Sequence, residues 1–135
     1  MDIKRARIVV VEDEKIMSTF VLTTLRRIGI LDLFAFDNGV AAFKALGKLK
    51  PDLILTDIHM QPMGGVELVR AMRASTDAAI STIPVIFLSA DSTPATIKEV
   101  LPLGVAGYLV KPPNINVLAT KIEQALNSPK TETSD

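Results

Sequence analysis

Four segments of this sequence end in polar side chains that could do chemistry together. The acidic pair Glu12-Asp13, the carboxylate of Asp57, the hydroxyl of Ser89 and the ammonium of Lys111 each stand at the end of a short apolar run. If these runs are strands of one parallel sheet, the side chains share its carboxyl edge, where open α/β sheets bind their ligands. The pattern therefore predicts one pocket built from segments far apart in the sequence.

The three carboxylates Glu12, Asp13 and Asp57 would repel one another in such a pocket. Either their pKa values are raised or a bound cation neutralises them. Oxygen ligands, in a chain with no cysteine and a single histidine, suit Mg²⁺, for which Mn²⁺ could substitute. With the cation present, Asp57 could attack phosphorus in line while Lys111 and Ser89 stabilise the oxygens of the transferring group.

These residues also have plainer interpretations when each is taken alone. The Glu12-Asp13 pair could be an acidic turn before a helix, and Asp57 could be an ordinary turn residue after a strand. The case for a phosphoryl-transfer site depends on finding all the positions in one sequence.

Five short apolar runs are expected to form the strands that position these residues. They cover residues 7–11, 33–36, 53–56, 85–89 and 107–110. Between them, apolar residues recur at helical spacing, which predicts five helices. Strands this apolar on both faces require helices on both sides, so the expected fold class is α/β, a doubly wound and mostly parallel five-stranded sheet.

Residues typical of helix ends support these boundaries. Two glycines could end helices and three polar residues could begin them: Gly29, Gly47, Ser92 or Thr93 with Pro94, and Asn114. The polar segment 74–84 is expected to be a loop. Residues 1–127 are expected to form one domain, followed by a flexible polar C-terminal tail over residues 128–135.

The composition of the whole chain limits the possible function classes. Its 135 residues suit one domain, and its net charge of zero, with scattered basic residues, gives no nucleic-acid footprint. The absence of cysteine excludes disulfides and thiol chemistry. No apolar run is long enough to span a membrane, and no secretory signal is recognisable, so a soluble cytoplasmic protein is expected.

Four motifs together resemble those of two-component response-regulator receiver domains. They are Val10-Val11-Glu12-Asp13, Leu55-Thr56-Asp57-Ile58-His59-Met60, Leu88-Ser89-Ala90 and Tyr108-Leu109-Val110-Lys111-Pro112. The resemblance covers residues 7–126. Among receivers, the chain resembles the single-domain, chemotaxis-type (CheY-like) ones. It implies a flavodoxin-like fold with strand order 2-1-3-4-5 and five helices.

The resemblance also implies a role for each matching residue of the pocket. Asp57 would be the phosphoacceptor, and Lys111 would contact the phosphoryl group. Glu12, Asp13, Asp57 and the backbone carbonyl of His59 would hold Mg²⁺, or Mn²⁺ in its place.

Further positions correspond to residues that respond to phosphorylation. Ser89 takes the place of the hydroxyl residue that moves toward the phosphoryl group, and Tyr108 that of the aromatic residue that changes rotamer. His59 and Asp91, each two residues after a site residue, would modulate dephosphorylation. The step Lys111-Pro112 matches a Lys-Pro peptide that is often cis in the family.

The sequence departs from the family pattern in two loops. The turn at residues 60–65 lacks the proline directly after the first methionine and the aspartate before the second glycine that many relatives have. Two prolines follow Lys111 where one proline and an aromatic residue are common. Neither change removes a reactive group.

The resemblance implies partners on both sides of the reaction. A sensor histidine kinase or a phosphotransfer protein would donate the phosphoryl group from a phosphohistidine. A downstream protein would bind the face made by the fourth helix, fifth strand and fifth helix, residues 97–126. The short stretch after Leu126 leads us to expect output by protein contact, with no direct nucleic-acid or membrane contact.

The domain is expected to catalyse its own phosphorylation and dephosphorylation rather than to turn over a substrate. An aspartyl-phosphate phosphatase acting on small phosphoesters is the enzymatic alternative, although such enzymes generally carry a second acidic residue where this chain has His59. The chain could also be the receiver portion of a longer regulator, or a constitutive interaction module with a vestigial pocket.

Overall fold

A computed structural model describes residues 1–91 and 93–127. They contain a five-stranded parallel sheet in the order β2-β1-β3-β4-β5, flanked by helices. The strands are β1 (Arg7–Val11), β2 (Asp32–Phe36), β3 (Leu53–Thr56), β4 (Val85–Ser89) and β5 (Gly107–Val110). The doubly wound α/β fold and the strand order 2-1-3-4-5 are therefore confirmed. Four strands have the predicted bounds, and β2 begins one residue earlier, at Asp32.

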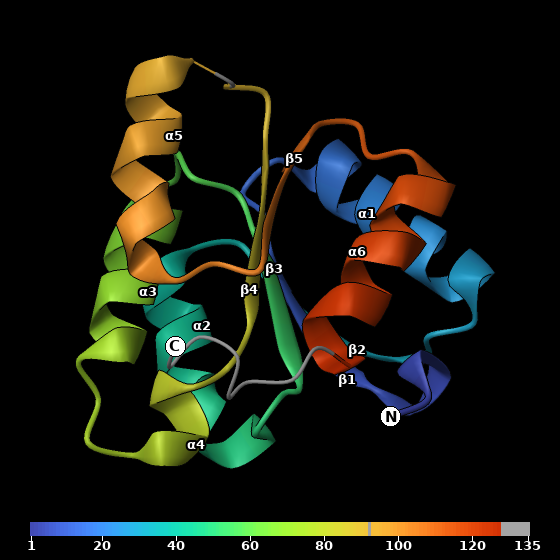
Figure 1. The fold of residues 1–135 in the computed structure, drawn as a ribbon, viewed down its shortest axis with the longest axis horizontal. Coiled ribbons are helices and arrows are strands. Elements are labelled where there is room, and N and C mark those ends of the chain that lie inside the picture. The colour runs from blue at the N-terminus through green and yellow to red at the C-terminus, as the bar shows by residue number, and fades with distance from the viewer. Residues whose placement is uncertain (92, 128–135) are drawn as a thin grey trace.

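Helices cover both faces of the sheet (Figure 1). They are α1 (Lys15–Ile28), α2 (Gly39–Leu49), α3 (Gly65–Arg73), α4 (Ala78–Ser81), α5 (Pro94–Val100) and α6 (Ile115–Asn127), with 3-10 turns η1 (Ile3–Arg5) and η2 (Leu101–Leu103). Helices α1 and α6 lie on one face, and α2, α3, α4 and α5 lie on the other. The predicted fourth and fifth helices thus correspond to α5 and α6.

The helix α4 corrects the expectation of a loop over residues 74–84. Asp77 is the N-cap of this helix, and its carboxylate accepts a hydrogen bond of 2.9 Å from the backbone N–H of Ala79. One helical turn is too short to display an apolar period, so the pattern that predicted the other five helices could not reveal it.

Alternating strand residues point into two separate cores. In β1, Val9 and Val11 belong to the core under α2, α3 and α5, whereas Ile8 and Val10 belong to the core under α1 and α6. Strands β1, β3 and β4 are buried on both faces, which is the reason that they read as continuous apolar runs. The sheet consequently lies between two helical layers, with one core on each of its faces.

Three of the predicted helix ends are confirmed and one is wrong. Gly29 ends α1 with a φ of 106°, and the Thr93 and Asn114 side chains accept hydrogen bonds at the starts of α5 and α6. Gly47 does not end α2, which continues to Leu49 and ends at Lys50. Partial burial of Leu49 against the core explains the extra turn. The alternative cap Ser92 and the tail 128–135 lie outside the described residues.

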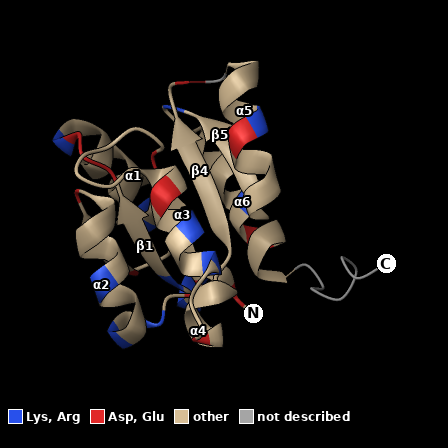
Figure 2. Ribbon diagram, turned by 90° about the vertical axis from the view of Figure 1, so that its left-hand side faces the viewer, with Lys and Arg blue, Asp and Glu red and all other residues tan. Residues whose placement is uncertain are grey.

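The register of the sheet brings the predicted site residues to one edge. Val11 is paired with Thr56, so Glu12 and Asp57 leave neighbouring strands at the same level. Acidic segments gather in the loops at this carboxyl edge, toward which the β4 arrow points (Figure 2). No described helix has the length and apolar character needed to cross a membrane.

Candidate phosphoacceptor and metal site

Three carboxylates converge at the carboxyl edge of the sheet, as the sequence predicted. Glu12 and Asp57 are only 5% and 8% exposed, whereas Asp13 is exposed to solvent. One ligand oxygen from each of the three residues lies within 4.8 Å of the others. Such spacing would let the three oxygens share one cation.

Lys111 brings the opposite charge into this cluster. Its Nζ donates a hydrogen bond of 2.8 Å to Oε1 of Glu12 and one of 3.1 Å to Oδ2 of Asp57. The lysine is placed by its own backbone N–H, which donates to the carbonyl of Ser89 at 3.0 Å, and it precedes a cis peptide bond to Pro112. The pocket therefore contains three carboxylates and one ammonium group.

Burial and hydrogen bonding compete in setting the charges. Burial raises the pKa of Glu12 above its ordinary value and outweighs the hydrogen bond from Lys111, which acts to lower it. Burial acts to lower the pKa of Lys111, but its hydrogen bonds to Glu12 and Asp57 outweigh that effect, so the pKa is raised. The ammonium form is consequently favoured beside the two buried carboxylates.

The backbone fixes the orientation of the Asp57 carboxylate. The N–H of Ile58 donates to Oδ1 at 2.7 Å, so Oδ2 is the oxygen directed to Lys111. Gly65 passes so close that a Cβ atom there would lie 2.1 Å from the carbonyl oxygen of Asp57. This requirement for glycine at Gly65 was not predicted, although the Gly64-Gly65 pair is a visible signal of a tight turn.

Ser89 and Tyr108 lie near the cluster without joining it. The buried hydroxyl oxygen of Ser89 accepts a hydrogen bond of 3.1 Å from the backbone N–H of Asp91. The Tyr108 hydroxyl is buried and has no partner with hydrogen-bond geometry among the described residues. Burial raises its pKa, while the nearby Ser89 hydroxyl acts to lower it.

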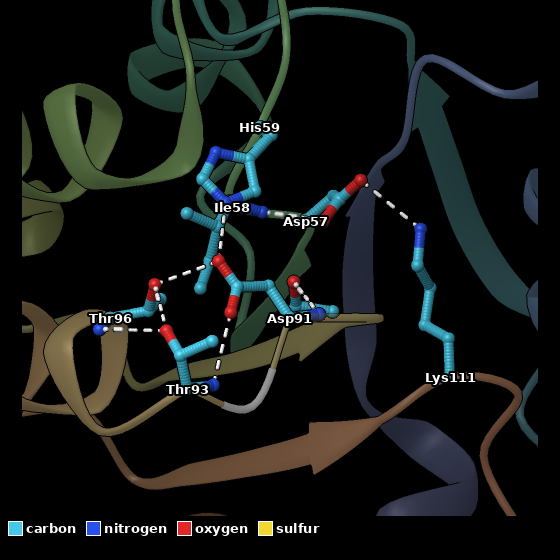
Figure 3. A network of polar contacts seen from close by, with 8 residues as sticks. Asp57, Ile58, His59, Asp91, Thr93, Thr96 and Lys111 are labelled. Atoms are coloured by element: carbon cyan, nitrogen blue, oxygen red, sulfur yellow. Dashed lines mark hydrogen bonds and ion pairs between the residues drawn. The ribbon is translucent and has the colours of Figure 1, made fainter.

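His59 and Asp91 meet at the mouth of the site (Figure 3). Nε2 of His59 lies 3.0 Å from Oδ2 of Asp91, and the same oxygen accepts from the Thr96 hydroxyl at 2.7 Å. Oδ1 of Asp91 accepts from the Thr93 N–H at 3.0 Å. These bonds, led by that from Thr93, hold the pKa of Asp91 well below its ordinary value. No motif or spacing in the sequence indicated that Thr93 and Thr96 bond to the Asp91 carboxylate.

The donor set fits a hard divalent cation. All three candidate ligand atoms are carboxylate oxygens, the type that Mg²⁺ and Mn²⁺ prefer, and the exposed Asp13 leaves the cluster open to solvent. The arrangement can hold a cation, present one carboxylate oxygen to an electrophile and place an ammonium group beside it.

Comparisons with known proteins agree with this geometry. Residues 8–123 match the family model of the response regulator receiver domain. The chemotaxis protein CheY of Pseudomonas aeruginosa is 34% identical over 87% of this chain and 94% of its own length. The signal receiver domain of a signal transduction histidine kinase from Syntrophus aciditrophicus has a TM-score of 0.81 at 30% identity, covering 93% of this chain and 92% of its own.

A further solved structure has the same fold at lower identity. The receiver domain of the sensor histidine kinase PA1611 from Pseudomonas aeruginosa, solved with a magnesium ion in its active site cleft, has a TM-score of 0.83 at 24% identity, covering 92% of this chain and 99% of its own. By its sequence match and by its structure, the chain belongs to the response regulator receiver domain family of two-component signalling and is CheY-like.

Proposed function

We propose that Asp57 accepts a phosphoryl group from a phosphohistidine of a sensor histidine kinase or phosphotransfer protein. The observation that carries this proposal is the contact of 3.1 Å between Lys111 Nζ and Asp57 Oδ2, beside the carboxylates of Glu12 and Asp13. In the reaction, an Asp57 oxygen forms a bond to phosphorus as the bond from phosphorus to the histidine nitrogen breaks. The nitrogen keeps that electron pair and leaves.

The side chains of the pocket would orient the reactants and stabilise charge. The N–H of Ile58 binds Oδ1 of Asp57, so Oδ2 is the oxygen that would face the phosphoryl donor. Lys111 can transfer one of its hydrogen bonds from Asp57 to a phosphoryl oxygen, and the Ser89 hydroxyl would donate another bond. Because Asp57 and Lys111 directly follow strands of a buried sheet, these two residues need little reorganisation.

Glu12, Asp13, Asp57 and the backbone carbonyl of His59 would hold Mg²⁺, or Mn²⁺ as a substitute. When bound, the ion would neutralise part of the negative charge that gathers as the phosphoryl group approaches. The three carboxylate oxygens within 4.8 Å of one another support the carboxylate part of this ligand set.

Phosphorylation would change the face made by α5, β5 and α6, and a downstream protein would read that face. Ser89 and Tyr108 would move, and His59 with Asp91 would set how fast the phosphoryl group is lost. Exposed apolar residues support a protein-binding role for this face: Leu101, Val110 and Val117. The proposed place of action is the cytoplasm, and the domain is proposed to act on its own Asp57 without turning over a substrate.

Incubation with acetyl phosphate and Mg²⁺ tests the proposal, with intact mass as the readout. The wild-type protein should gain one phosphoryl group that depends on Mg²⁺, and Asp57→Asn should gain none. Asp52→Asn serves as the matched control, because this half-buried residue lies before β3 and its carboxylate accepts a hydrogen bond of 2.8 Å from the Arg7 N–H, outside the pocket. Steady multiple turnover of small phosphoesters would instead favour the phosphatase alternative.

A further inference from the structure

Helix α5 is only thinly packed against the rest of the domain. Of its seven residues, Val100 is the only buried one, and it lies at the C-terminal end. The helix continues directly into η2, and Gly104 follows with a φ of 68°. Its position must therefore depend on what holds its two ends.

Arg73 holds the C-terminal end. Its guanidinium donates to the carbonyls of Leu103 at 3.1 Å and Gly104 at 3.5 Å, at the end of η2, which continues α5. It also donates to the carbonyls of Ser81 at 3.0 Å and Ile83 at 2.9 Å, at the entrance to β4. A planar guanidinium can bind several carbonyls at once, which the compact ammonium of lysine cannot do in the same geometry. Arg73, the last residue of α3, thus ties the end of the continuous α5–η2 segment to the C-terminal end of α3.

Asp91 holds the N-terminal end by separate bonds. Its carboxylate accepts from the Thr93 N–H and the Thr96 hydroxyl, and it contacts His59 on the loop after β3 (Figure 3). The four bonds of Arg73 go to other residues than Thr93 and Thr96, so the two ends of α5 are held by different side chains.

The N-terminal attachment alone is linked to the phosphoacceptor pocket. The Asp91 N–H donates to the Ser89 hydroxyl oxygen at 3.1 Å. If Ser89 turns toward a phosphoryl group on Asp57, this bond is lost and the Asp91 loop must adjust. The four bonds of Arg73 involve no residue between Ser89 and Thr96, so the same movement leaves them intact.

We propose that Arg73 anchors the C-terminal end of α5 as a fixed pivot, while Asp91 holds its N-terminal end in a resting position that phosphorylation releases. The release step rests on the proposed function of Asp57, whereas the two independent attachments do not. Helix α5 would then swing about Arg73 rather than move as a whole. Arg73 and Asp91 are positioning residues in this arrangement, since neither has to touch the phosphoryl group.

Amide hydrogen exchange of the full chain tests the two attachments separately. Asp91→Asn keeps the size of the side chain but weakens its bonds, and it should speed exchange at Thr96 and Ile97 by about three- to tenfold, as expected for one or two lost hydrogen bonds. Arg73→Lys should give a similar increase at Gly104 and leave Thr96 unchanged. Glu99→Gln is the matched control, because Glu99 lies on α5 and its ion pair with Arg70 is long at 3.9 Å.

Beryllofluoride with Mg²⁺ tests the release step in the wild-type protein. Amide resonances of Thr96 and Ile97 should shift in the same direction as in Asp91→Asn, and that of Gly104 should stay in place. Equal changes at both ends of α5, in either variant or with the mimic, would overturn the pivot. Failure of the mimic to perturb Ile58, next to Asp57, would refute the proposed function and the release step, while exchange in the variants still decides the two attachments.

Discussion

The ammonium of Lys111 lies 2.8 Å from the carboxylate of Glu12, although 99 positions separate the two residues in the sequence. Both side chains are more than nine-tenths buried. Transfer of such charges from water is costly, so the pair is stable only while both partners are present. The same ammonium also contacts Asp57, which couples the stability of the domain to the integrity of its reactive site.

Replacement of Lys111 by methionine should therefore destabilise the protein. Methionine keeps much of the volume but leaves Glu12 and Asp57 without their shared cation, at an expected cost of about 2–4 kcal/mol in the free energy of unfolding. Urea unfolding in EDTA measures the effect. Lys98→Met, an exposed change on α5, should stay within about 0.5 kcal/mol of the wild type. Equal stabilities for the two variants would contradict the importance of the buried pair.

Glu12 should make the metal-free protein less stable as the pH rises above 4.5. Its folded-state pKa is raised from 4.5, so in this window the folded protein binds more protons than the unfolded chain does. The favourable contribution is complete below pH 4.5 and is lost as the pH rises through the folded-state pKa. The contribution of Asp91 to stability has the opposite sign, because its pKa is lowered from 3.8 in the folded state. That contribution is present above pH 3.8 and is lost only at lower pH, outside this window.

Urea unfolding of Glu12→Gln in EDTA, at several pH values above 4, checks this sign. The difference in unfolding free energy between wild type and variant should change in favour of the variant across the window. The exposed substitution Glu99→Gln should show no such trend. Parallel profiles for wild type and Glu12→Gln would mean that the carboxylate does not titrate above its ordinary range.

The strands and their shared edge were predictable because they depend on local signals. Each buried strand is a continuous apolar run, and a parallel sheet necessarily brings the ends of those runs together. Glu12, Asp57 and Lys111 could thus be assigned to one pocket before any contact was known. The burial that raises the pKa of Glu12 could not be predicted, because it depends on how the loops close over the strand ends.

Features that depend on one or two tertiary contacts were not predictable. Glycine at Gly47 normally favours a helix end, but burial of Leu49 extends α2 past it. The four carbonyls around Arg73 come from the chain after α3 and from the end of η2, so no spacing along the sequence reveals them. Side chains that bond to distant backbone atoms leave no periodic signal.

Two glycine-to-alanine substitutions should have opposite effects. A Cβ at Gly65 would lie 2.1 Å from the Asp57 carbonyl oxygen and 2.9 Å from the Phe87 ring, so Gly65→Ala should cost about 1–3 kcal/mol or more. A Cβ at Gly47, inside α2, meets no atom within 4 Å, so Gly47→Ala should stabilise by about 0.5–1 kcal/mol. Urea unfolding compares the two. A tolerated Gly65→Ala would show that the loop after Asp57 can shift freely.

Removal of the Tyr108 hydroxyl should not cost stability. This buried group has no hydrogen-bond partner among the described residues, so Tyr108→Phe should leave the unfolding free energy unchanged or raise it by up to about 1 kcal/mol. Tyr108→Leu is the contrasting variant, because the ring packs against the core beneath α3 and α5, and its loss should cost about 1–3 kcal/mol. A loss above about 1 kcal/mol in Tyr108→Phe would mean that the hydroxyl is bonded in the resting state, with the Ser89 hydroxyl as its partner.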